Sequence, residues 1–436
     1  MKRRAFIVVL IVGLLLSGCT MKTIDQMYCL PKRSEESNNL QSAIDAAMVE
    51  LEYSAPVSGE NQQTVQMADL DGDGKLEYLL FAKGTAAQPL RILIFRNING
   101  DYIHADTIKS NGTEFDQVEY AKMDDSNSIM LIVGKKISDQ VSRTLSVYTF
   151  TADGMEQLIT TNYRKFLPTD LNKDGISELF VLRSGMTETD NGLAEFYTLE
   201  NGTMERSNEV SMSQPADQLK RIIIGKLQDD IPAVFAASAV GDTAIVTDIF
   251  AIKNDLLTNV TTSNAAGTGV QTVRNYYVYA DDIDSDGVVE LPDLLTPITA
   301  DDVLGKHDLI LWYAMSASGE KTAKMYTYHN FVGGWYFKLD SAWAESVTVS
   351  NIGNRYEFFV WNRDSQTSKR VMTIFVSSSQ NTSDIDNQSG DIILLKTESI
   401  LYTASLDDAA NDYNITKEFV MDGFYLIRED WKTGEM

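Results

Sequence analysis

The sequence predicts an all-β fold built from repeated units of about four strands each. Three observations lead to this prediction: a recurring hydrophobic marker residue, a short apolar run of strand type near each marker, and Asn-Gly or Asp-Gly pairs between later apolar runs. The markers are Leu70, Met123, Leu171, Leu227, Ile283 and Ile352. A period of about 40–60 residues with about four strands is typical of a propeller. We therefore expect a six- or seven-bladed β-propeller with a short N-terminal helix.

The helix is expected between Ser34 and Tyr53. Ser34 can cap its start, and Glu35 and Glu36 lie in the first turn, where acidic side chains interact favourably with the helix dipole. Its apolar stripe consists of Leu40, Ile44, Met48 and Leu51. We expect this stripe to pack against the propeller, because the polar face carries acids rather than the Lys and Arg of a membrane-surface helix.

The strands near the markers are expected at Tyr78–Phe81, Ile129–Val133, Leu179–Leu182, Ile231–Phe235 and Tyr356–Val360. Asn275–Tyr279 is expected to form a strand before the fifth marker. Short hairpin turns are expected at Asn99-Gly100, Asp153-Gly154, Asn201-Gly202 and Gly333-Gly334. A seventh blade would be closed if Gln63–Ala68 paired with strands near Phe424–Ile427, since propeller rings often join their two termini in one sheet.

Three of the markers lie within acidic loops that share the pattern D-x-[DN]-x-D-G-x-x-E, which we number from position 1 to position 9. The loops are Asp69–Glu77, Asp170–Glu178 and Asp282–Glu290. Oxygens at positions 1, 3, 5 and 9 can converge on one hard cation, and the glycine at position 6 permits a sharp turn. The predicted metal ligands are Asp69, Asp71, Asp73, Glu77, Asp170, Asn172, Asp174, Glu178, Asp282, Asp284, Asp286 and Glu290. This oxygen-only set suits calcium as a structural ion in up to three loops.

The loops do not have the surroundings of an EF-hand, which needs a glutamate at position 12 and a helix on each side. Position 12 holds Leu80, Val181 and Asp293, and Pro292 argues against an exit helix after the third loop. We therefore interpret them as calcium loops between β-strands. The alternative is an acidic turn that binds no ion.

The other three markers lie at position 2 of weaker copies of this loop pattern. Position 1 of these copies is Lys122, Lys226 or Asn351. We expect no metal there. Acidic residues follow both lysines, at Asp124 and Asp125 in one case and at Asp229 and Asp230 in the other. One hypothesis is that each lysine ammonium replaces the metal charge by ion pairing; the alternative is that both lysines point into solvent.

The amino terminus has the pattern of a secretory signal. Lys2, Arg3 and Arg4 form a positive region, the apolar core over residues 5–16 is too short for a comfortable membrane span, and Leu16-Ser17-Gly18-Cys19 matches a bacterial lipobox. The match implies cleavage before Cys19 and lipid attachment to its sulfur; an ordinary signal peptide or a signal anchor is the alternative. The expected organisation is a lipoprotein signal peptide (1–18), an anchor segment with the helix (19–62), the β-propeller (63–431) and a C-terminal tail (432–436).

With these motifs the chain resembles the FG-GAP or VCBS-type repeats of the integrin-α N-terminal propeller. More narrowly, it resembles FG-GAP-like lipoproteins of Gram-positive, clostridial-type bacteria, through the lipobox and through Tyr53–Pro56, Val65–Asp69 and Phe424–Arg428. The resemblance covers roughly residues 24–431. It implies a calcium-binding propeller anchored by lipid to the outer face of the bacterial cell membrane, but it says little about the ligand.

The composition excludes some classes of function. The formal net charge of −25 over 436 residues argues against nucleic acid as a partner. The three histidines have no zinc spacing, and we find no nucleophile elbow, Walker loop or dinucleotide fingerprint. Tryptophans such as Trp312, Trp335 and Trp343 could stack on sugars, although packing between blades explains most of them.

We therefore expect a binding module for an extracellular glycan or protein. The alternatives are a propeller-fold carbohydrate-active enzyme (a lyase or glycosidase) and an envelope-assembly scaffold. An enzyme would require carboxylate, Tyr or Arg side chains that converge at the centre of the ring.

Overall fold

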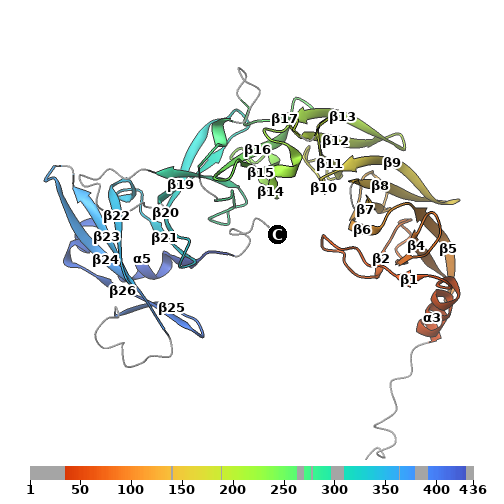
Figure 1. The fold of residues 1–436 in the computed structure, drawn as a ribbon, viewed down its shortest axis with the longest axis horizontal. Coiled ribbons are helices and arrows are strands. Elements are labelled where there is room, and N and C mark those ends of the chain that lie inside the picture. The colour runs from red at the N-terminus through yellow and green to blue at the C-terminus, as the bar shows by residue number, and fades with distance from the viewer. Residues whose placement is uncertain are drawn as a thin grey trace, which may run out of the picture.

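The computed structural model describes residues 35–138, 141–187, 189–262, 270–275, 278–295, 309–362, 364–378 and 391–428. In these ranges the chain forms six antiparallel sheets in sequence order, with one helix before them. Figure 1 shows the sheets following one another along an arc, with the first and the sixth at its two ends. The signal peptide (1–18), Cys19 and the tail (432–436) lie outside the described residues.

The first three sheets contain residues from the N-terminal half of the chain. The first consists of β1 (Glu52–Tyr53), β2 (Val65–Ala68), β3 (Glu77–Lys83), β4 (Leu90–Ile98) and β5 (Asp101–Ser110). The second consists of β6 (Glu114–Ala121), β7 (Met130–Ser138), β8 (Val141–Thr151) and β9 (Gly154–Tyr163). The third consists of β10 (Lys165–Thr169), β11 (Glu178–Arg183), β12 (Leu193–Glu200) and β13 (Thr203–Ser211).

The remaining sheets follow, together with short helices. The fourth sheet consists of β14 (Leu219–Lys226), β15 (Pro232–Val240), β16 (Ala244–Lys253) and β17 (Leu256–Asn259). The fifth consists of β18 (Glu290–Leu295), β19 (Leu309–Met315), β20 (Lys321–Asn330), β21 (Trp335–Leu339) and β27 (Phe424–Leu426). The sixth consists of β22 (Val347–Ile352), β23 (Arg355–Asn362), β24 (Thr367–Ser378), β26 (Ile400–Leu406) and β25 (Ile392–Lys396). The short helices are η1 (Ala216–Gln218), η2 (Val270–Thr272), η3 (Ala344–Ser346), η4 (Asp408–Tyr413) and α5 (Lys417–Asp422).

The hydrophobic core lies mainly between consecutive sheets, as expected for blades that pack face to face. The interface between the first two sheets contains Phe81 and Phe115, whose rings meet edge to face at a centroid distance of 5.1 Å. Ring pairs also join the second sheet to the third (Tyr163 with Phe166), the third to the fourth (Phe180 with Phe250) and the fifth to the sixth (Tyr328 with Phe358). The repeated meander of about four strands and this packing between sheets define a β-propeller architecture.

Five of the six markers are buried as the repeat predicts. Leu70, Met123, Leu171, Leu227 and Ile283 are at most 7% exposed. The sixth assignment is wrong: Ile352 is 51% exposed, because it ends β22 and a tight turn at Gly353 leads directly into β23. The sixth sheet therefore lacks the loop that buries the marker in the other five.

The N-terminal helix α3 (Glu35–Ala47) lies within the predicted range but ends earlier. Beyond it, Glu52 and Tyr53 leave the helical path and pair with β3 as β1. The apolar stripe packs as predicted: Ile44 is buried in a cluster with Leu80, Leu93 and Phe95 of the first sheet. No helix within the described ranges is long and apolar enough to cross a membrane.

The four predicted hairpin turns are confirmed as the connections β4–β5, β8–β9, β12–β13 and β20–β21. A turn of the same kind joins β16 to β17 at Asn254 and Asp255, both with positive φ, and was not predicted because no glycine marks it. Asn275–Tyr279 was predicted as a strand; the described residues Asn275, Val278 and Tyr279 belong to none. Val278 and Tyr279 are nevertheless buried in the core, which explains their apolar pattern.

The predicted closure of a seventh blade is wrong. The strand β2 pairs with β3 of its own sheet, whereas β27 pairs with β21 of the fifth sheet. The physical reason is aromatic packing: Phe424 lies against Trp335 and Tyr402, and Tyr425 stacks on Tyr336 at 5.1 Å. The described residues thus contain six blades, and the C-terminal strand extends the fifth.

Candidate metal centres

The three acidic loops lead into their sheets in a similar way, although the first two follow a strand (β2 and β10) and the third follows only an isolated bridge between Asp281 and Glu290. Each loop leads into the strand that begins with its position-9 glutamate, which places Glu77, Glu178 and Glu290 at the start of β3, β11 and β18. All three glutamates are buried, at most 4% exposed. The glycine at position 6 has a positive φ in every loop, between 84° and 86°, a conformation that other residues rarely adopt.

The same hydrogen bonds shape all three loops. The position-6 N–H donates to the position-1 aspartate, as from Gly74 to Asp69 at 3.0 Å, and the equivalent bonds occur in the other two loops. The position-7 N–H donates to the position-5 aspartate at 2.8 Å in each loop. The position-2 N–H donates to the position-9 glutamate, at 2.8 Å from Leu70 to Glu77. These bonds turn the acidic side chains toward the inside of each loop.

Three carboxylates converge in each loop, with ligand oxygens within 4.8 Å of one another. The clusters are Asp69, Asp71 and Glu77; Asp170, Asp174 and Glu178; and Asp282, Asp284 and Glu290. Asn172 joins the second cluster, because its amide donates to Glu178 and Asp174 at 2.6 and 2.9 Å. Asp73 and Asp286 were predicted as ligands but lie outside these clusters. Within the described ranges no other cluster of His, Cys, Asp or Glu meets the same criterion.

The electrostatics of the loops favour a bound cation. Burial raises the pKa of Glu77, and burial together with the neighbouring aspartates raises the pKa of Glu178 and of Glu290 to about 7. Two buried oxygens, Oδ1 of Asp69 and Oε1 of Glu290, receive no hydrogen bond from the described residues. A buried acceptor without a donor is costly, and a metal ion would satisfy it. The donor sets therefore fit a hard divalent cation.

Two basic side chains approach the acidic loops, and no local pattern in the sequence predicts either contact. In the first loop, Arg96 from β4 forms an ion pair with Asp71, and its Nε lies 3.5 Å from Glu77. In the third loop, Nζ of Lys324 lies 3.1 Å from Asp286. Both basic residues come from a later strand of the same sheet, so only the folded chain brings them to the loop.

The weaker copies differ from one another. Lys226 forms an ion pair with Asp230 at 2.7 Å, and Lys173 of the preceding acidic loop contacts the same carboxylate at 2.7 Å. Lys122 forms no ion pair with any described residue, and its side chain is exposed. The hypothesis of a lysine that replaces the metal charge therefore has a structural basis at Lys226 but none at Lys122.

A main-chain link joins loops of neighbouring sheets, and sequence reasoning missed it. The N–H at position 8 of one loop donates to the carbonyl at position 1 of the loop before it. The three bonds run from Ile129 to Asp69, from Ser177 to Lys122 and from Val289 to Lys226, at 3.2, 2.9 and 3.0 Å. Because two of the acceptors are lysines, the link does not depend on an aspartate at position 1.

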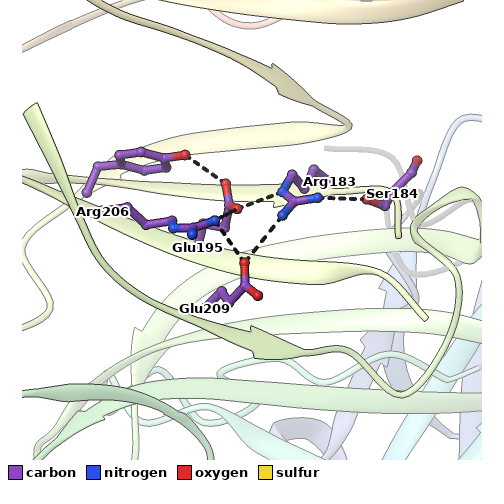
Figure 2. A network of polar contacts seen from close by, with 6 residues as sticks. Arg183, Ser184, Glu195, Arg206 and Glu209 are labelled. Atoms are coloured by element: carbon purple, nitrogen blue, oxygen red, sulfur yellow. Dashed lines mark hydrogen bonds and ion pairs between the residues drawn. The ribbon is translucent and has the colours of Figure 1, made fainter. Parts of the chain in front are cut away.

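A second polar network lies in the third sheet, away from the loops (Figure 2). Glu195 on β12 is 1% exposed and accepts hydrogen bonds from Arg183 at 2.6 Å, from Arg206 at 2.8 Å and from Tyr197 at 2.8 Å. Burial alone would raise the pKa of Glu195, but these bonds lower it below its ordinary value. The carboxylate is thus held ionised and fully bonded, which suits a structural role rather than proton transfer.

The aromatic residues considered for sugar stacking are mostly part of the core. Trp312, Trp335 and Trp343 are at most 2% exposed, so they have no face for a ligand. The histidines also lie apart: His104 is exposed and bonded to Thr107, whereas His329 is fully buried. His307 lies outside the described residues.

Comparisons with known proteins add little. No family model and no curated relative matches the chain. Among solved structures, the chain is similar to the exotype rhamnogalacturonan lyase YesX at 15% identity and a TM-score of 0.29, covering 74% of this chain and 65% of that one. It is similar to a putative 6-phosphogluconolactonase from Bacteroides uniformis at 11% identity and a TM-score of 0.30, and the match covers 73% of this chain and 94% of that protein. It is similar to TolB from Acinetobacter baumannii at 12% identity and a TM-score of 0.23, and the match covers 77% of this chain and 69% of TolB. At these scores the similarity identifies no family, and the fold class rests on the sheet topology itself.

Proposed function

We propose that this chain is a calcium-binding β-propeller, anchored by lipid to the outer face of the bacterial membrane, that binds an extracellular glycan or protein. The observation that carries the calcium assignment is the convergence of three carboxylates in each of three loops with one shared hydrogen-bond pattern. Oxygen-only donor sets with buried, unbonded carboxylate oxygens suit calcium better than a softer metal.

Titration calorimetry of the full chain in detergent tests the calcium assignment. We expect up to three sites, with dissociation constants of about 10⁻⁴–10⁻³ M as in other extracellular modules. Asp284→Ala should remove one site, whereas Asp125→Ala, in a loop of the weaker type, should leave the stoichiometry unchanged. A chain that takes up no calcium at millimolar concentration would contradict the assignment.

The anchor rests on Leu16-Ser17-Gly18-Cys19. Metabolic labelling with a fatty-acid probe should tag the wild-type chain and Cys29→Ala, but not Cys19→Ala. Equal labelling of Cys19→Ala would exclude lipid attachment at this cysteine.

The enzyme alternative would need carboxylate, Tyr and Arg side chains that converge. One described group of these residue types is centred on Asp116 of β6, which accepts a hydrogen bond from Tyr163 and lies 3.1 Å from Arg143. Burial and the adjacent Asp116 raise the pKa of Tyr163 well above its usual range, which keeps the phenol protonated and so unable to accept a proton near neutral pH. A glycan array and a pull-down from cell envelope, each with calcium and with chelator, test binding. Cleavage of a polysaccharide by the purified chain would favour the enzyme alternative instead.

A further inference from the structure

The first acidic loop already contains a cation of the chain itself, the guanidinium of Arg96. Arg96 lies on β4 and forms an ion pair with Asp71. Its Nε lies 3.5 Å from Oε1 of Glu77, and its Nη2 lies 3.8 Å from Oδ2 of Asp73. Asp71 and Glu77 are two of the three residues whose ligand oxygens converge in this loop. The guanidinium therefore contacts carboxylates that would bind calcium.

The second sheet helps to hold Arg96 in this position. The central carbon of the guanidinium lies 5.0 Å from the centroid of the Phe150 ring, on β8. A cation over an aromatic ring is attracted by the negative face of the ring. The first two sheets are neighbours at one end of the arc (Figure 1), and the side chain of Arg96 is 28% exposed. Arg96 is thus packed between its own loop and the next sheet.

Among the described residues, no basic side chain takes the same position in the other two acidic loops. In the third loop, Nζ of Lys324 lies 3.1 Å from Asp286, which is outside the converging cluster. In the second loop, none of the three converging carboxylates forms an ion pair with a described residue. The three loops thus share one pattern of main-chain hydrogen bonds but differ in the basic group that faces their carboxylates.

We propose that Arg96 competes with calcium for the first loop and makes this loop the weakest of the three metal sites. A guanidinium and a calcium ion repel each other, so calcium binds to Asp71 and Glu77 only when Arg96 leaves them. The charge-assisted contacts of Arg96 must then be broken. Calcium that enters the second or third loop breaks no such contact with a converging carboxylate. The proposal rests on the proposed calcium-binding function and specifies the order in which the sites fill.

The competition gives Arg96 a different effect at low and at high calcium. Without the ion, the acidic side chains of the first loop repel one another, and the guanidinium offsets part of this repulsion. With the ion bound, Arg96 has lost these partners and contributes little to stability. The first loop is thus held in shape at calcium concentrations that fill only the other two loops. Because calcium binding and the pairing of Arg96 exclude each other, each weakens the other by the same factor.

Calorimetric titration of the full chain in detergent with calcium measures the competition at the first loop. A chain that carries Asp174→Ala and Asp284→Ala keeps the complete set of predicted ligands in the first loop alone. In this chain, Arg96→Gln should tighten calcium binding about tenfold, the effect of removing one competing charge-assisted hydrogen bond. An unchanged dissociation constant would overturn the proposal.

Arg91→Gln is the matched control for this titration. It removes the same charge from the same strand, but Nη1 of Arg91 donates to the carbonyl oxygen of Leu90 at 3.1 Å and to no carboxylate of the loop. Calcium binding should therefore stay close to that of the parent chain. Equal tightening by Arg91→Gln and Arg96→Gln would show a general effect of net charge and would overturn the competition.

A second measurement leaves the other two loops intact. The free energy of unfolding of Arg96→Gln is compared with that of wild type in chelator and in saturating calcium. The variant should be less stable in chelator, and the difference should shrink in calcium by about 1.4 kcal/mol, the equivalent of tenfold in affinity. Arg91→Gln should differ from wild type by the same amount in both buffers. A difference for Arg96→Gln that calcium leaves unchanged would show a purely structural role and would overturn the proposal.

The calcium assignment and the competition can be refuted separately. If wild type binds calcium, but Arg96→Gln neither tightens binding to the first loop nor narrows the difference in stability, the competition is refuted and the calcium assignment stands. If wild type takes up no calcium at millimolar concentration, the calcium assignment is refuted and the competition with it.

Discussion

The N–H of Ser177 donates a hydrogen bond of 2.9 Å to the carbonyl oxygen of Lys122, and so joins the acidic loop of the third sheet to the weaker copy in the second sheet. The bond belongs to a series with Ile129 to Asp69 and Val289 to Lys226. Because the bond uses the main chain, it forms both where position 1 is an aspartate and where position 1 is a lysine. The loops thus hold neighbouring blades together in addition to offering carboxylates.

Removing this donor should destabilise the protein. Ser177→Pro deletes the N–H that donates to the carbonyl of Lys122, and the loss of one such hydrogen bond costs about 0.5–1.5 kcal/mol. Ser177→Ala keeps the N–H and should stay close to wild type. Urea unfolding measures both; equal stability of the two variants would show that the link contributes nothing.

Calcium should raise the melting temperature of the full chain, and magnesium should do so less. Calcium at ten times its dissociation constant stabilises a folded protein by about 1.4 kcal/mol per site. Asp71→Ala, Asn172→Ala and Asp284→Ala should each remove part of the increase, because each loses one ligand of one loop. Calorimetric melting in chelator and in millimolar calcium provides the measurement. Superimposable melting curves in the two buffers would refute the prediction.

The effect of Glu290→Gln should change sign with calcium. Burial raises the pKa of Glu290 to about 7 in the metal-free fold, above its unfolded value near 4.5. Its contribution to stability is therefore complete below about pH 4.5 and is lost as the pH rises through about 7. In chelator at pH 8, Glu290→Gln should be more stable than wild type; in calcium it should be less stable, because a ligand is missing. The free energies of unfolding of wild type and Glu290→Gln, measured at pH 5 and pH 8 in chelator and in calcium, test this prediction. The same order of stability in chelator and in calcium at pH 8 would contradict it.

The free energy of unfolding should fall at acid pH in part because His329 becomes protonated. Burial lowers the pKa of His329 to about 3, below its unfolded value near 6.5, and its ring stacks on Tyr336 at 5.1 Å. The contribution is complete above about pH 6.5 and is lost as the pH falls toward about 3, by up to about 1.4 kcal/mol per pH unit. His329→Phe should flatten the stability profile between pH 6 and 4. The exposed His104→Phe should keep the wild-type slope; an unaltered slope in His329→Phe would contradict the assignment.

Lys226 and Lys122 should respond differently to truncation. Lys226→Met loses the ion pair with Asp230, so its melting temperature should fall slightly at low salt and recover at high salt. Lys122→Met breaks no described ion pair and should melt like wild type at both salt concentrations. Identical behaviour of the two variants would remove the basis for treating Lys226 as a replacement for the metal charge.

Local patterns predicted the parts of the fold that depend on neighbouring residues. The acidic loops, the Asn-Gly turns and the stripe around Ile44 each depend on short-range spacing, and the structure bears them out. Contacts distant in sequence had no such signal. Arg96 reaches the first loop from a later strand, and Arg428 meets Asp281 from 147 residues away. The pairing of β27 also escaped prediction, because aromatic packing on Trp335 and Tyr336 outweighs the tendency of a ring to join its termini.

The pairing of β27 with β21 also sets an order of events during biosynthesis. The segment that forms the sixth sheet lies between these two strands in the chain, so the fifth sheet gains its outer strand only after that segment has been made. The first four sheets contain only residues that are synthesised earlier, and they can assemble before the fifth sheet is complete. A nascent chain that is interrupted before Phe424 would expose the edge of β21, an unpaired strand that invites aggregation.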